Sequence, residues 1–173
     1  MIAAIAVALA VTAAVSDVRE GRIPNALTYP SMVLGLAVQT GLYGWRGLSL
    51  SLAGGLLFGG VFLVFYLIRV MGAGDVKLAA ALGCIVGVSA SVSVMIATAF
   101  AGGALAILIM VVSGKVIRTV RNTLSVIWHH ARHGLKAHPE TNLDNPKAAR
   151  MPYGVAFAVG TLYWTLSSSS LWR

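Results

Sequence analysis

The chain has 173 residues, of which 58% are hydrophobic and only 10% are charged, and its formal net charge is +8. A soluble domain carries about 25% charged residues, so this chain lacks the polar surface that would cover a water-soluble globule. Together with a mean hydropathy of +0.84, this indicates an integral membrane protein whose excess apolar surface faces lipid.

Apolar stretches alternate with short polar segments along the chain, and most are close to the length of a membrane span. The stretch 2–16 is slightly short, and 76–88 is short enough to sit low in the protein without crossing fully. We expect helices at about 2–16, 26–43, 48–68, 76–88, 91–112 and 151–170. A cleaved signal peptide is the competing interpretation of the first stretch, but no basic residue precedes it. Residues 78–112 contain no charge and would form a helix about 52 Å long, so we expect a break near Gly87.

The segment 113–150 is the one long polar region. Its apolar residues recur at spacings of three and four, which predicts a basic amphipathic helix on the membrane surface. The expected fold is therefore all-α, a single polytopic membrane domain over residues 1–173 with about six transmembrane helices plus this basic cytosolic segment.

Charge counting orients the chain. With six spans, one side of the membrane receives 11 basic residues and the other receives only Arg46 and Arg173. Basic residues mark the cytosolic side, so both termini are expected outside. Because the positive charge lies between spans, it indicates membrane orientation, and we expect no nucleic-acid partner.

Only five acidic residues exist: Asp17, Glu20, Asp75, Glu140 and Asp144. The expected topology brings Asp17 and Asp75 to the cytosolic edge of the membrane at similar depth. Two adjacent carboxylates can share one proton, so that the ionised group activates a water and the protonated group polarises a peptide carbonyl. The sequence does not say which aspartate is the base and which is the acid.

Other interpretations of these residues are simpler. Taken singly, Asp17 is typical of a solvated loop and Asp75 of a helix N-cap. Glu20 shares its loop with two arginines, so an ion pair is expected there. The four histidines lie in one segment without acidic or thiol partners at ligand spacing, and the single Cys84 lies in an apolar run, so no metal site is expected.

Three segments then resemble elements of a known family. Gly72-Ala73-Gly74-Asp75-Val76-Lys77 matches the G-x-G-D-x-K signature of type IV prepilin peptidases, which are GxGD aspartyl proteases. Asp17 followed by Ile23-Pro24-Asn25 is similar to their first catalytic motif, and Met151-Pro152-Tyr153-Gly154 resembles a third family element. The resemblance covers essentially the whole chain.

The resemblance implies that Asp17 and Asp75 are catalytic, with Gly72, Gly74, Lys77, Pro24 and Asn25 as supporting motif residues and with no cofactor. It also implies a multi-pass protein of the bacterial inner membrane that removes the leader of type IV prepilins or pseudopilins at the cytosolic face. Long members of the family carry a cytosolic region with paired cysteines and also methylate the pilin. This chain, with one cysteine, is similar to the short peptidases of tight-adherence (Flp) pilus systems.

Two further functions remain open from the residues alone. A small membrane transporter would need charged residues lining a pathway, and the expected spans hold almost none at mid-depth. A scaffold subunit of a secretion or pilus machine would use segment 113–150 as a docking surface. The oligomeric state and the pilin that is cleaved are not specified by the sequence.

Overall fold

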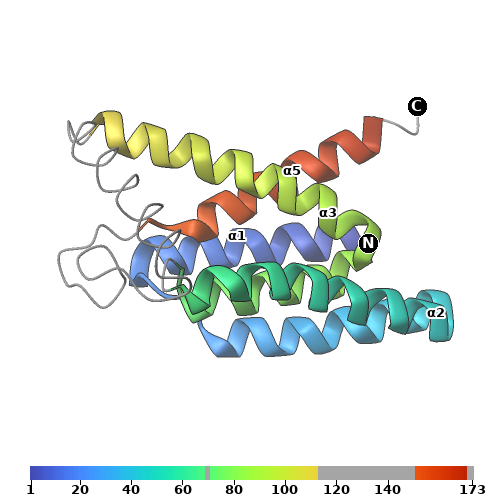
Figure 1. Cartoon of the computed structure of the whole chain (residues 1–173). Helices are drawn as coiled ribbons and strands as arrows, with labels where there is room; N and C mark the ends of the chain where they lie inside the picture. Colours follow the sequence, from blue (N-terminus) through green and yellow to red (C-terminus); the bar gives the residue numbers. More distant parts are fainter. Residues whose placement is uncertain (69–70, 113–150, 171–173) are drawn as a thin grey trace.

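A computed structural model describes residues 1–68, 71–112 and 151–170. In these ranges the chain is helical, with α1 at Ile2–Glu20, α2 at Asn25–Leu67, α3 at Ala73–Val112 and α5 at Tyr153–Ser170 (Figure 1). Three of them, α1, α2 and α3, are long and apolar enough to cross a membrane. The all-α membrane fold is confirmed, whereas the number of membrane crossings stays a prediction and segment 113–150 lies outside the described residues.

Two of the helices break at a single glycine and fold back. Gly44 of α2 has φ 60° and ψ −143°, and Gly87 of α3 has φ 76° and ψ 169°. Both φ values lie in the left-handed region, which glycine adopts without a steric penalty. In Figure 1 the two halves of α2 run in opposite directions from the bend that carries its label, and α3 reverses at the same end of the molecule.

The predicted break near Gly87 is therefore confirmed. The predicted turn at 44–47 is shorter than expected, since one residue makes the reversal and helical geometry resumes directly after it.

The predicted polar loops were too long at the other end of the molecule. Helix α1 continues through Asp17 to Glu20 and ends at Gly21, whose φ of 64° and N–H bond to the Asp17 carbonyl form a left-handed C-cap. Helix α3 begins already at Ala73, so Asp75 lies in its first turn and not in a loop. Hydropathy placed these ends at the first polar residue, but the local caps extend each helix beyond it.

Small residues allow the helices to approach closely. A Cβ on Gly35 would lie 2.8 Å from the Cys84 carbonyl carbon, and Gly54 and Gly83 face one another with no room for a side chain. The first half of α3 thus packs against both halves of α2. Without a hydrophobic force between helices in lipid, such backbone contact is a principal source of packing energy.

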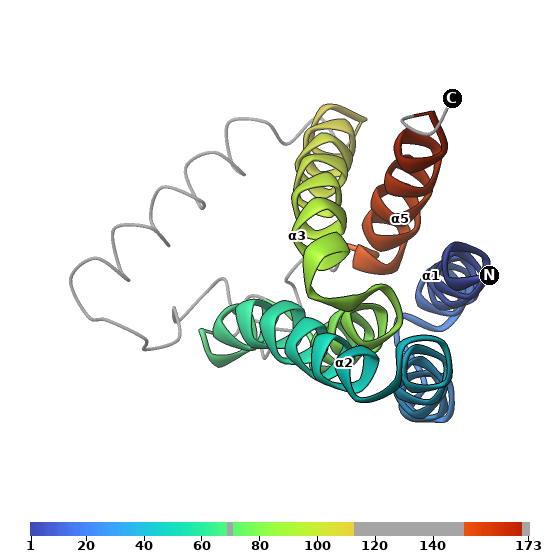
Figure 2. The same cartoon turned by 90° about the vertical axis from the view of Figure 1, so that its right-hand side faces the viewer.

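An aromatic cluster joins α2 to α5 beside this interface. The ring of Phe62 lies 5.4 Å from that of Phe58 and 5.0 Å from that of Phe157, measured between centroids. Phe58, Phe157, Leu78 and Leu82 are fully buried. Viewed along the helices in Figure 2, α1 lies beside α5, and the two halves of α2 lie on the other side of the molecule from the second half of α3.

Candidate active site

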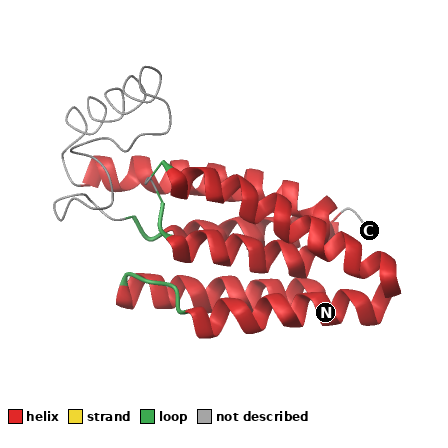
Figure 3. Cartoon of the chain, turned by 60° about the horizontal axis from the view of Figure 1, so that its bottom comes forward, coloured by secondary structure: helices red, strands yellow, loops and turns green. Residues whose placement is uncertain are grey.

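The ends of three helices meet at the end of the molecule where the connecting loops lie (Figure 3). Helix α1 finishes there, while α3 and α5 begin there. The first N–H groups of a helix have no partner within the helix, and the positive end of its dipole favours a nearby anion. The N-termini of α3 and α5, which lie beside the C-terminal end of α1, can therefore stabilise carboxylates at this end of the molecule.

Asp17 contacts the N-terminus of α5. Its Oδ2 accepts a hydrogen bond of 2.8 Å from the backbone N–H of Gly154. A Cβ on Gly154 would lie 2.9 Å from Asp17 Cβ and 3.0 Å from Ala14 Cα, so only glycine allows this approach. The side chain of Asp17 is half-buried as a result.

Asp75 is held by the N-terminus of its own helix. Its Oδ2 accepts a 3.1 Å hydrogen bond from the N–H of Gly72, and its own N–H donates to the Gly72 carbonyl at 3.2 Å. With Gly72 as the N-cap, the Asp75 side chain forms one half of a capping box from the N3 position, so the alternative in which Asp75 is itself the N-cap is wrong by three positions. Each aspartate thus uses Oδ2 for a backbone N–H, and within the described residues neither Oδ1 has a hydrogen-bond partner.

The two carboxylates lie in one electrostatic environment. The charge of Asp17 acts on Asp75, and the charge of Asp75 acts on the hydroxyl of Tyr153. Tyr153 and Gly154 are consecutive residues at the start of α5, where Gly154 is bonded to Asp17 and Tyr153 lies within electrostatic range of Asp75. The structure therefore brings together Asp17 and Asp75, which 58 residues separate in the sequence.

The supporting motif residues connect the first loop to α3. Lys77 Nζ donates a 2.8 Å hydrogen bond to Asn25 Oδ1 and lies 5.3 Å from the centroid of the Tyr29 ring. Residues two apart on a helix point to different sides, so Lys77 faces α2 while Asp75 faces the site. Lys77 forms no ion pair with a carboxylate among the described residues.

The glycines of the second motif also make specific contacts. A Cβ on Gly74 would lie 3.2 Å from Ile23 Cβ, so this glycine lets the loop after α1 approach the start of α3. Pro24 is the N-cap of α2, with φ −66° and ψ 140°, and its carbonyl accepts from the N–H groups of Leu27 and Thr28. Residues of both motifs thus touch one another directly.

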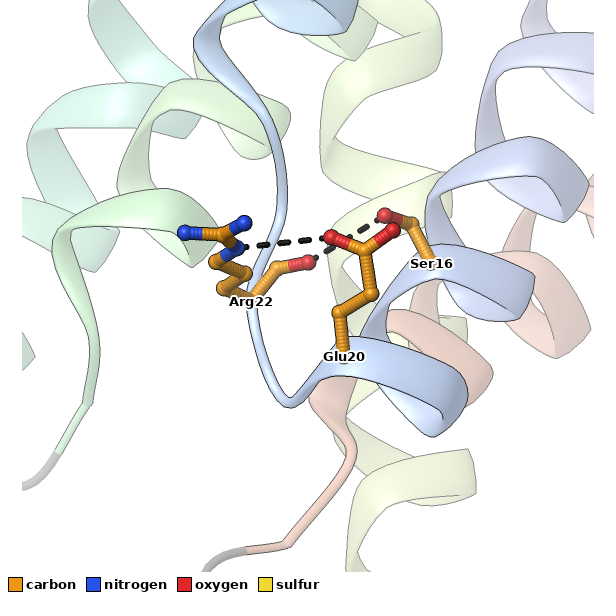
Figure 4. Close-up of polar contacts among 3 residues, drawn as sticks. All are labelled: Ser16, Glu20 and Arg22. Atoms are coloured by element: carbon orange, nitrogen blue, oxygen red, sulfur yellow. Dashed lines mark hydrogen bonds and ion pairs between the residues drawn. The ribbon is translucent and has the colours of Figure 1, made fainter.

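Glu20 has the local role that the sequence predicts. Arg22 Nε lies 3.3 Å from Glu20 Oε2, and Ser16 Oγ donates to the Arg22 carbonyl (Figure 4). Both charged side chains are more than half exposed. Such surface pairs contribute at most about 1 kcal/mol, so this contact shapes the loop without adding a third acid to the site.

Sequence reasoning missed the role of the start of α5. The segment Met151–Gly154 was named as a motif, but no function was given to Gly154 or Tyr153. No group of three or more metal-ligating side chains gathers in the parts of the chain that the structure describes. Glu140, Asp144 and the four histidines lie outside these parts.

An aspartyl hydrolase of the membrane requires two carboxylates on apolar helices, one as general base and one as general acid. A family model described as the type IV leader peptidase family matches residues 4–107. This match covers more than half of the chain, and the chain therefore belongs to the type IV leader peptidase family, which implies a protease. Comparison with curated proteins and with solved structures finds no match.

Proposed function

We propose that this protein is an aspartyl endopeptidase that removes the leader peptide of type IV, Flp-like prepilins or pseudopilins. It would act in the bacterial inner membrane, at the cytosolic face, with Asp17 and Asp75 as its catalytic pair. The observation that carries the proposal is that Asp17 and Asp75 lie within electrostatic range of each other, each with one oxygen bound to a backbone N–H beside a helix start.

The chemistry follows from two carboxylates that hold one proton between them. The ionised group accepts a proton from a water while the water oxygen bonds to the carbonyl carbon of the scissile peptide. The protonated group donates a hydrogen bond to the carbonyl oxygen. The intermediate then collapses, the C–N bond breaks, and the leaving amine takes up the proton.

Fixed backbone donors make this arrangement effective. The N–H groups of Gly154 and Gly72 orient one oxygen of each carboxylate, and among the described residues both Oδ1 atoms are without a hydrogen-bond partner and so open to water and substrate. Donors that are already in place need no rearrangement as the charge of the transition state develops.

The test is cleavage of a prepilin by purified protein in detergent. Asp17→Asn and Asp75→Asn should each reduce the rate by about 10²- to 10⁴-fold, the range for loss of general acid–base catalysis. Both variants should keep the thermal unfolding temperature within a few degrees of the wild type. Glu20→Gln removes a carboxylate from the same end and should cleave normally. Wild-type rates in either aspartate variant would rule out the catalytic pair.

A further inference from the structure

A cleft of about 380 Å³ opens at the end of the molecule remote from the aspartates. Ile2, at the start of α1, forms part of its wall, whereas Asp17 lies near the end of the same helix. Fifteen residues of helix separate the two, which corresponds to about 22 Å. The other lining residues come from the two helix breaks: Gln39, Tyr43, Arg46, Leu50, Val86, Gly87, Val88 and Ser89. The cleft is therefore separate from the proposed active site.

The two glycine breaks build this cleft. The helices reverse direction at Gly44 and Gly87. The residues on either side of these two breaks line the cleft. Gln39 is 4% exposed and donates a 2.9 Å hydrogen bond to the carbonyl of Ile85, which holds one wall in place. The shape is thus a fixed product of the fold.

The lining has two chemical halves. Arg46, Tyr43 and Ser89 offer hydrogen-bond donors, while Ile2, Leu50 and Val86 are apolar. Arg46 is exposed and forms no ion pair within residues 1–68, 71–112 and 151–170. The carboxylates described in the structure, Asp17, Glu20 and Asp75, belong to the opposite end. A guanidinium without a carboxylate partner, beside apolar wall, suits an anion that carries a hydrocarbon chain.

The position of the cleft along the molecule specifies the source of that anion. Trp45 is 82% exposed and Tyr43 is 59% exposed, and both are next to the break at Gly44. Exposed Trp and Tyr beside apolar helices mark the level of lipid headgroups. From this we infer that the cleft binds an anionic phospholipid, with its phosphodiester at Arg46 and the first part of an acyl chain against Ile2 and Leu50.

The experiment measures lipid binding to the delipidated full-length protein by native mass spectrometry. Dioctanoyl phosphatidylglycerol should bind at least about fivefold more tightly than dioctanoyl phosphatidylcholine, the factor expected for one basic residue at a membrane surface. Arg46→Gln should abolish this preference. Arg19→Gln removes the same charge from the exposed end of α1 and should retain it. Leu50→Trp fills the apolar side and should weaken both lipids.

Several outcomes would overturn the inference. Equal binding of the two lipids to the wild type would exclude a site for an anion, as would an unchanged preference in Arg46→Gln. Displacement of phosphatidylglycerol by millimolar inorganic phosphate would show that the cleft binds free phosphate rather than lipid. A thermal unfolding scan of each variant separates loss of the site from loss of the fold, and a folded Arg46→Gln protein is required for the comparison.

Discussion

At the end that holds Asp17 and Asp75, backbone N–H groups at helix starts are bound by side-chain carboxylates. At the opposite end, the break at Gly87 interrupts α3, and the carbonyls of Cys84 and Ile85 are bound by the side chains of Ser51 and Gln39. Both ends satisfy backbone groups that a continuous helix would pair internally. At the end with Asp17 and Asp75, free backbone N–H groups are paired with acidic side chains. At the end with the breaks, free backbone carbonyls are paired with the neutral donors of Ser51 and Gln39.

This difference supports the proposal that hydrolysis takes place at the end that holds Asp17 and Asp75. Carboxylates are stabilised where helix N-termini point, and within the described residues the second oxygen of each aspartate has no hydrogen-bond partner. The amide of Gln39 and the hydroxyl of Ser51 are buried and hold α3 in shape, and neither can serve as a general base near neutral pH. Substitutions at the first end should therefore act on turnover, and those at the second end on stability.

Among substitutions outside the two aspartates, the largest loss of cleavage rate is expected for Gly154→Ala. The added methyl would lie 2.9 Å from Asp17 Cβ and 3.0 Å from Ala14 Cα, so α5 must move away and the 2.8 Å bond to Asp17 must lengthen. Loss of a preorganised backbone donor typically costs about 10²-fold or more in rate. Prepilin cleavage should fall by this factor in protein that still unfolds cooperatively.

Gly103→Ala provides the matched control. A Cβ at Gly103 meets nothing within 4 Å, and this residue lies within α3, where alanine is a better helix former than glycine. Its cleavage rate should equal that of the wild type. If Gly154→Ala also cleaves at the wild-type rate, the contact between α5 and Asp17 has no catalytic importance.

The contrast also shows what a sequence can and cannot reveal. The turn near Gly44 and the break near Gly87 were predictable, because apolar runs longer than a span must reverse and glycine permits it. The bond from Gly154 to Asp17 was not predictable, since it joins residues 137 apart through a backbone amide that every residue except proline carries. Helix packing, which side-chain patterns specify poorly, decides where that amide points.

Some information in the sequence was overlooked. Gln39 is a lone amide within an otherwise apolar predicted helix, and a polar side chain in such a place usually has a specific partner. Its partner is a carbonyl that the break at Gly87 leaves open, 46 residues further along the chain. The same logic applies to Ser51, whose hydroxyl donates to the Cys84 carbonyl at 2.6 Å. Reading both with the predicted break would have indicated their role.

An intermediate effect is expected for Gln39→Leu, which tests the end with the breaks. The variant removes the donor to Ile85 and leaves a buried carbonyl without a partner, which costs about 1–3 kcal/mol of unfolding free energy. Chemical unfolding in detergent measures this loss. The folded fraction should cleave prepilin at the normal rate, because the site lies at the other end of the helices.

Thr40→Val is the appropriate control for Gln39→Leu. Thr40 is the next residue, and its hydroxyl donates only to the carbonyl of Leu36 within its own helix. That carbonyl keeps its helical partner after the substitution, so stability should change by less than about 0.5 kcal/mol. Equal losses in the two variants would contradict a capping role for Gln39.

The smallest effect is expected where the two sequence motifs touch, at Lys77 and Asn25. Lys77→Met should slow cleavage by about tenfold, because the start of α3 loses a charged hydrogen bond of 2.8 Å that fixes Asp75 relative to the loop after α1.

Asn25→Ala should have a similar effect, and the double variant should be no worse than either single one if the two residues act only through each other. Asn25→Asp keeps an acceptor for Lys77 and should cleave nearly normally. Additive losses in the double variant would show that each residue affects the site separately, and the bond between them would then have no positioning role.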